Sequence, residues 1–208
     1  MNIQKLPKRV TLAVALMMVA ALPAIAQEKT AKIQLSPAEL QSRATELKLQ
    51  PAQLRNIRVA ASRLVAFNGW AVVQEFTGNF ESVAKSYDEF SNNFKEQKIQ
   101  AAPNQPAILI LLDDPNSGNF HYLVGYQVAS KIEPKAPLKL RQMEHPSSVR
   151  FTHVGAYEQL GNVHAGLSAS VKEFHKKETT FPVVLRLLND PRKVPPAQRK
   201  TEIVVPVS

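Results

Sequence analysis

An internal repeat constrains the fold of this chain more than any other feature of its sequence. Segment 77–96 (TGNFESVAKSYDEFSNNFKE) matches segment 154–173 (VGAYEQLGNVHAGLSASVKE) at an offset of 77 residues, and 106–115 (PAILILLDDP) matches 182–191 (PVVLRLLNDP) at an offset of 76. Chance does not readily give two matched segments in the same order. The repeat therefore indicates two copies of one supersecondary unit.

Each copy has the pattern of a strand, a helix and two further strands. In the first copy, the strand 71–76 is broken at Gly78, an apolar stripe at helical spacing follows, and the runs 107–112 and 120–128 are short and rich in β-formers. Asp-Asp-Pro and Asn-Asp-Pro are typical of turns. The second copy is predicted to contain the strand 149–154, the helix after Gly155, and the strands 183–188 and 201–207.

The predicted fold is α+β, with tandem βαββ repeats at about 70–128 and 147–208 whose antiparallel sheets form a central ligand cleft. One such unit exposes the sheet face that its helix leaves uncovered. Two units solve this by joining edge to edge or face to face, and either arrangement leaves a groove between the repeats, where small-molecule sites are commonly found. Segment 131–146 contains three prolines and is predicted to be an extended crossover.

The first 26 residues have the pattern of a cleaved secretory signal. Three basic residues precede an apolar run at 12–22, which is too short to span a membrane, and Ala24-Ile-Ala26 is a cleavage sequence. We expect cleavage after Ala26, no transmembrane segment in the mature chain, and a periplasmic or secreted protein.

Residues 27–68 are expected to form a helical extension before the ligand-binding domain at 69–208. Ser36, Pro37 and Glu39 make a good helix start, because serine caps, proline suits the first turn and glutamate reaches back to the cap. Helices are predicted at 37–48 and at about 51–66, and packing against the sheet is their expected role.

Composition excludes several classes of function. The chain has no cysteine, so disulfides, thiol nucleophiles and thiolate metal sites are ruled out. Without the signal, 23 basic residues face 17 acidic ones, and their dispersal favours a solvated surface over a nucleic-acid partner. His164 and His175 are about 16 Å apart on one predicted helix, too far to share a metal ion. We predict no metal and no cofactor, and no protein partner is identified.

Four segments carry a resemblance to a known family: "GNFESVAKSYDEF", "ILLDDP", "HVGAYEQLG" and above all "LLNDPRKVPPAQRKTEIVVPV". Over about residues 70–208 the chain resembles the GyrI-like small-molecule-binding domain, which has the SOUL/GyrI-like fold and also serves as the effector-binding domain of AraC- and MerR-type regulators. The resemblance implies a cleft for hydrophobic, often cationic compounds, with a buried glutamate from the last strand at the position of Glu202. Some relatives are hydrolases that use this glutamate. The chain lacks a helix-turn-helix segment, so we do not expect a transcription regulator.

Strand periodicity also singles out Glu202. In 201–207, Ile203, Val205 and Val207 share one face, which is apolar and expected to pack on the helices. Glu202 lies on the other face with Val204, which is expected to look into the cleft. A carboxylate there could hold an organic cation or act as a general acid or base. The alternative is that Glu202 points to solvent from an exposed edge.

Three aromatic residues are further candidates for ligand binding. Trp70 is the only tryptophan and can stack on a cationic ligand, or it can be a core residue. His121 shares the predicted cleft face when the two repeats are aligned. Tyr157 follows the break at Gly155 and can bring its hydroxyl to the cleft mouth, although helix capping or core packing would also explain it.

The favoured hypothesis is an exported protein that captures a small hydrophobic or cationic compound between its repeats. The alternative is a cofactor-independent hydrolase of reactive small molecules with Glu202 as general acid/base. A third possibility is an interaction module whose cleft is filled by its own side chains.

Overall fold

A computed structural model of the chain describes residue 49 and residues 51–208. The predicted signal at 1–26 and the predicted helix at 37–48 therefore lie outside the described residues. The second predicted helix is α2 (Pro51–Ala61), which ends earlier than expected because strand β1 already begins at Val65. In the part that the structure describes, no helix is both long and apolar enough to pass through a bilayer.

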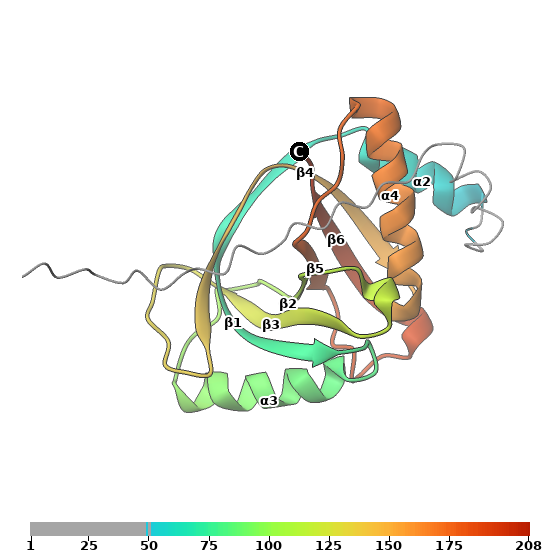
Figure 1. Cartoon of the computed structure of the whole chain (residues 1–208). Helices are drawn as coiled ribbons and strands as arrows, with labels where there is room; N and C mark the ends of the chain where they lie inside the picture. The colour runs from blue at the N-terminus through green and yellow to red at the C-terminus, as the bar shows by residue number, and fades with distance from the viewer. Residues whose placement is uncertain (1–48, 50) are drawn as a thin grey trace, which may run out of the picture.

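The two predicted βαββ repeats are present in the expected order (Figure 1). The first repeat consists of β1 (Val65–Gly78), α3 (Val83–Glu96), β2 (Ala107–Leu111) and β3 (Phe120–Val128). The second consists of β4 (Lys139–Val154), α4 (Leu160–His175), β5 (Val183–Leu187) and β6 (Lys200–Pro206). Short 3-10 turns occur at Pro115–Ser117, Tyr157–Gln159 and Pro196–Gln198. The α+β class is confirmed.

The sheets of the two repeats close into one antiparallel barrel in the order β1-β3-β2-β5-β6-β4. The repeats join twice, where β2 pairs with β5 and where β1 pairs with β4. The pairing of β1 with β4 uses residues of segment 131–146, which was predicted to be an extended crossover. That prediction is wrong from Lys139 onwards, where β4 begins. Its register shifts near Pro146, which has no amide hydrogen to donate to the ladder.

Alternating residues of the barrel strands divide the core into two clusters. Residues on the outer face pack against the helices, and those of β6 are Ile203 and Val205, as the periodicity predicted. The inner face is filled by nine buried apolar side chains: Phe67, Ala71, Val73, Ile108, Ile110, Leu123, Met143, Val184 and Val204. The faces that the helices leave uncovered therefore meet each other, and close packing replaces the predicted groove there.

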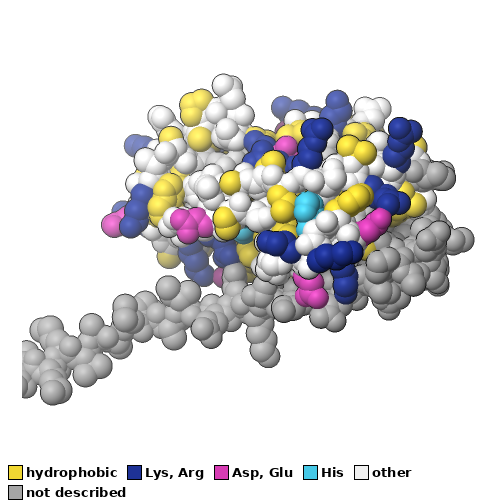
Figure 2. Space-filling model, turned by 90° about the horizontal axis from the view of Figure 1, so that it is seen from above, with side chains coloured by type: hydrophobic (Ala, Val, Ile, Leu, Met, Phe, Trp, Pro, Cys, Tyr) yellow, Lys and Arg dark blue, Asp and Glu magenta, His cyan; other side chains and the backbone are white. Residues whose placement is uncertain are grey.

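The helices cover opposite sides of the barrel. Helix α3 lies along β1 and β3, while α4 lies beside β4, and α2 contacts both α4 and β4 (Figure 1). A Cβ atom on Gly166 of α4 would lie 3.3 Å from a methyl group of Ile57, which explains how closely α2 approaches. α2 thus packs chiefly on α4. The face seen from above carries its Lys and Arg side chains at several separate places, with acidic groups among them (Figure 2).

Candidate functional site

A cavity of about 390 Å³ lies between the two repeats on the outer face of the barrel. It is enclosed by the first turns of α3, the 3-10 turn before α4, and the β5–β6 connection (residues 188–199). We call it the inter-repeat cleft. Its lining consists of Phe80, Glu81, Val83, Ala84, Tyr87, Tyr157, Glu158, Leu187, Pro191, Arg192, Pro196 and Arg199. The volume falls in the range of small-molecule pockets.

Equivalent residues of the two repeats meet in this cleft. Phe80 and Tyr157 correspond in the repeat alignment, and their ring centroids are 6.1 Å apart. Each follows a glycine that ends the preceding strand. At Gly155 the backbone has φ +151°, and a Cβ atom would lie 2.8 Å from Nε2 of His153, so a side chain would strain the turn that positions Tyr157.

The ring of Tyr157 forms one aromatic face of the cleft. It is buried, and burial raises the pKa of its hydroxyl to about 12. The guanidinium of Arg199 lies over the ring, 4.8 Å from its centroid. The Nε atom of Arg199 is buried without a hydrogen-bond partner, and its guanidinium forms no ion pair with any residue that the structure describes. Tyr157 therefore already holds a cation by its ring face.

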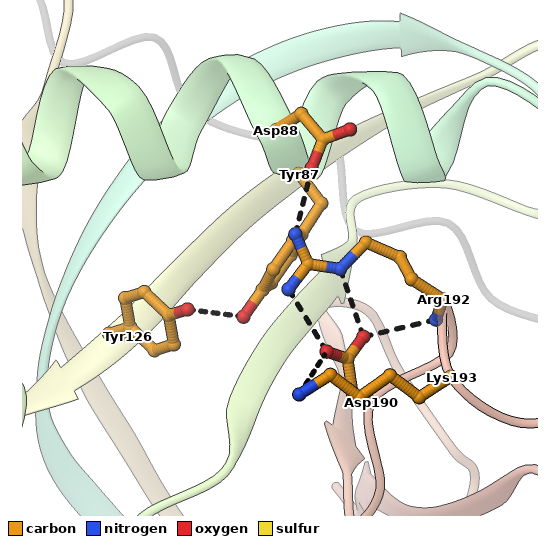
Figure 3. Close-up of polar contacts among 6 residues, drawn as sticks. All are labelled: Tyr87, Asp88, Tyr126, Asp190, Arg192 and Lys193. Carbon is orange, nitrogen blue, oxygen red and sulfur yellow. Dashed lines mark hydrogen bonds and ion pairs between the residues drawn. The ribbon is translucent and has the colours of Figure 1, made fainter.

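The ring of Tyr87 forms the second aromatic face. Its hydroxyl hydrogen-bonds the hydroxyl of Tyr126, and burial together with this bond raises the pKa of Tyr87. The guanidinium of Arg192 lies 5.0 Å from the Tyr87 ring centroid. Asp190 and Asp88 accept hydrogen bonds from the same guanidinium (Figure 3). This face holds a cation as well.

A second cavity, of about 540 Å³, lies on the other side of Arg192. We call it the Tyr126 cavity. It extends towards β2 and reaches Tyr126 and Arg186. It shares four lining residues with the inter-repeat cleft, namely Tyr87, Leu187, Pro191 and Arg192.

Comparison with known proteins identifies the family. The family model of the GyrI-like small molecule binding domain matches residues 71–208. This chain belongs to the GyrI-like family. A search of the curated proteins found no significant match. The predicted resemblance is thereby confirmed, and the domain is one that binds small molecules.

Solved structures support the GyrI-like fold. The EcmrR–DNA complex, seen by electron cryomicroscopy, is similar with a TM-score of 0.60 and 14% identity, over 83% of this chain and 72% of that one. The C-terminal domain of EcmrR is similar with a TM-score of 0.54 and 16% identity, over 70% of this chain and 96% of that one. A hydrolase from Listeria innocua is similar with a TM-score of 0.50 and 14% identity, over 71% of this chain and 92% of that one. At these identities the likeness shows the fold alone.

The structure places only Tyr157, of the four predicted site residues, in the inter-repeat cleft. Trp70 is half-buried on β1 and packs against the outer core cluster. His121 is exposed on β3, where its Nδ1 atom lies 2.8 Å from Oδ2 of Asp113. Neither Trp70 nor His121 lines the inter-repeat cleft.

Glu202 lies on the predicted face of β6 but has an ionic partner. It shares that face with the buried Val204, and its carboxylate pairs with the guanidinium of Arg186 on β5. The two side chains are 19% and 17% exposed. Arg186 also donates a hydrogen bond to Oε1 of Gln105. Glu202 is therefore screened by an adjacent cation, on the opposite face of the sheet from the tyrosine rings.

Sequence reasoning missed Phe80, Tyr87, Arg192 and Arg199 as site residues. Tyr87 belongs to the apolar stripe that helical spacing predicted for helix α3, and its ring also lines the cleft. The two arginines belong to "NDPRKVPPAQRK", the segment that carries most of the family resemblance. Their interspersion with prolines in a connection between strands was the available signal, since such a connection can fold over a neighbouring helix.

Histidines give no metal site in the described part of the chain. None of the residues 51–208 join a group of three or more His, Asp or Glu that could hold a metal ion. His164 is buried in α4 beside the Phe181 ring, and His175 bonds to the carbonyl oxygen of Ala61. Both therefore serve the packing of α4.

Proposed function

We propose that this GyrI-like protein is exported and captures a small hydrophobic or cationic organic compound in the inter-repeat cleft. The observation that carries the proposal is that two tyrosine rings, Tyr87 and Tyr157, each already bind a guanidinium by the ring face. An aromatic face that attracts an arginine attracts an organic cation for the same electrostatic reason.

The charges around the cleft support a cationic ligand. Glu81 and Glu158 line the mouth and are exposed, so both can meet a cation as it enters. Arg199 has no ionic partner among the residues that the structure describes, so a ligand that displaces it from Tyr157 breaks no salt bridge with any of them. Apolar lining from Val83, Ala84 and Leu187 supplies the hydrophobic contact.

Export is proposed from the sequence of residues 1–26, with a mature chain that starts at Gln27. Such a protein would meet its ligand outside the cytoplasm. The hydrolase alternative has less support, because Glu202 is held by Arg186 and does not line the cleft.

Fluorescence titration tests the proposal with two aromatic probes of opposite charge, ethidium and 8-anilinonaphthalene-1-sulfonate. The wild-type protein should bind ethidium more tightly than the sulfonate. Tyr157→Leu should weaken ethidium binding by about 3- to 30-fold, the range of one cation–π contact. The matched Tyr157→Phe protein retains the ring and should bind like wild type.

Two results would contradict this site. Preference for the sulfonate would show that the unpaired guanidinium of Arg199, and not the ring, selects the ligand. Loss of ethidium binding in a folded Glu202→Gln protein, with Tyr157→Leu unaffected, would place the site at the inner face of the barrel.

A further inference from the structure

Arg192 lies at the boundary between the inter-repeat cleft and the Tyr126 cavity. Both cavities count Arg192 and Tyr87 among their walls, and Leu187 and Pro191 line both of them. Arg192 reaches from the β5–β6 connection to helix α3, where its guanidinium lies over the Tyr87 ring (Figure 3). Of the four residues at this boundary, Arg192 is the one with a long, flexible and charged side chain.

Arg192 is held as a ligand would be held. Its Nε and Nη2 atoms donate to the two oxygens of Asp190 at 2.9 and 3.0 Å, and Nη1 donates to Oδ1 of Asp88 at 2.9 Å. The paired bonds to Asp190 match the fork of the guanidinium to a carboxylate. One ring face and two carboxylates thus surround one planar cation.

The contacts of Arg192 are also of a kind that can be exchanged. Its side chain is 43% exposed, and that of Asp88 is 59% exposed. The Asp88 pair is in contact with water and contributes little to stability, whereas the paired bonds to Asp190, which is 25% exposed, are the stronger contact that a ligand must reproduce. A ligand that supplies its own planar cation would keep the Tyr87 stacking and both carboxylate pairings while Arg192 moves into solvent.

We propose that Arg192 is an internal occupant of the binding site, and that elongated planar organic cations displace it and extend through both cavities. This inference rests on the proposed function, and it adds the class of ligand and the residue that selects for length. Compact cations need only the inter-repeat cleft and leave Arg192 in place.

The test compares ethidium, a compact planar cation, with 4′,6-diamidino-2-phenylindole, an elongated planar dication with two amidinium groups. Arg192→Gln removes the internal cation, which frees Asp88 and leaves Asp190 with the Lys193 ammonium at 3.8 Å. We expect this variant to bind the elongated probe about tenfold more tightly than wild type, the size of one exposed cation–π contact with its ion pair. Because Arg192 also lines the inter-repeat cleft, ethidium affinity should rise as well, but by a factor at least about threefold smaller than that for the elongated probe. Arg63→Gln, at an exposed arginine outside both cavities, is the matched control and should match wild type for both probes.

A second measurement uses the wild-type protein and so does not depend on how the variant folds. The NMR signal of the Arg192 Nε–H group should move to the position of a solvated arginine on addition of the elongated probe, and should keep the shift of a group hydrogen-bonded to Asp190 with ethidium. The inference is overturned if Arg192→Gln binds the elongated probe no better than wild type, or if the Arg192 signal does not respond to it. Ethidium binding with either of those results would refute the inference and leave the proposed function standing. Failure of both probes to bind either protein would refute both.

Discussion

Arg186 and Glu202 face each other across β5 and β6, in register, and their side chains form an ion pair on the inner face of the barrel sheet. Each is more than four-fifths shielded from solvent. The Nε atom of Arg186 is buried and has no hydrogen-bond partner among the described residues, so the guanidinium depends on Glu202 and Gln105. An unpaired charge at a buried position lowers the free energy of unfolding more than the loss of an ion pair at the surface.

Glu202→Gln is therefore expected to lower the free energy of unfolding by about 2 kcal/mol, because it leaves the largely buried Arg186 charged and without its anion. Replacing both residues, as in Arg186→Leu with Glu202→Leu, should recover most of the loss. Urea denaturation of Arg186→Leu, Glu202→Leu and the double variant, beside Glu202→Gln, measures the coupling energy between the two side chains. Equal losses in Glu202→Gln and in the double variant would show that the loss does not come from leaving Arg186 without its anion.

The face of Glu202 could be predicted, but its surroundings could not. Alternation along 201–207 correctly separates Ile203 and Val205 from Val204. Alternation does not show which residue of the neighbouring strand faces Glu202. That residue is Arg186, sixteen residues earlier on another strand. Since most strands of this chain are apolar on both faces, the pattern also could not show that the inner faces close on each other in a barrel.

The repeat predicted the architecture well because each copy constrains the other. A strand, helix and two strands recur at the predicted places, and Phe80 and Tyr157, aligned by the repeat, meet in the cleft. The cation-holding face of Tyr87 was beyond prediction. Arg192 lies 104 residues after its partner Asp88, and only the folded β5–β6 connection brings them together.

Signal cleavage is a separate prediction from the sequence. When the full chain is expressed in a bacterial host, we expect the mature protein to begin at Gln27 and to appear in the periplasmic or secreted fraction. Intact-mass measurement and fractionation check this. Ala24→Leu combined with Ala26→Leu removes the small residues of the cleavage sequence and should leave the precursor uncleaved. A full-length cytoplasmic protein from the wild-type gene would contradict export.

His164 should make the stability of the fold fall in mild acid. Burial lowers its pKa to about 4, from an ordinary value near 6.5. The unfolded chain thus takes up the proton in the window between pH 6.5 and 4, while the folded chain does not. Stability is fully present above pH 6.5 and decreases as the pH falls through that window. The loss attributable to His164 at pH 4.5 is on the order of 2 kcal/mol.

Denaturation at pH 7.5 and at pH 4.5 measures this effect. His164→Leu should reduce the difference between the two pH values, since it removes the buried group that must stay neutral. Some pH dependence should remain, because burial also lowers the pKa of His145 and His153. His121→Gln, at an exposed position, serves as the control. An unchanged pH dependence in His164→Leu would show that His164 is not held neutral by burial.

Gly125 permits the close approach of β1 and β3 that closes the barrel. It pairs with Val73 in register, and a Cβ atom added to it would lie 2.5 Å from the carbonyl oxygen of Val72 and 2.7 Å from Cγ1 of Val73. One of these atoms is backbone and the other belongs to a buried, β-branched side chain, so neither can move away. Gly125→Ala should lower the free energy of unfolding by about 2 to 3 kcal/mol, through overpacking.

Gly69→Ala is the matched control on β1, because the atom nearest to its added Cβ is the end of the flexible Gln127 side chain, at 3.3 Å. This variant should lower the free energy of unfolding by less than about 1 kcal/mol. Thermal unfolding of the two variants makes the comparison. Equal melting temperatures would mean that β1 and β3 lie further apart at Gly125 than the barrel requires.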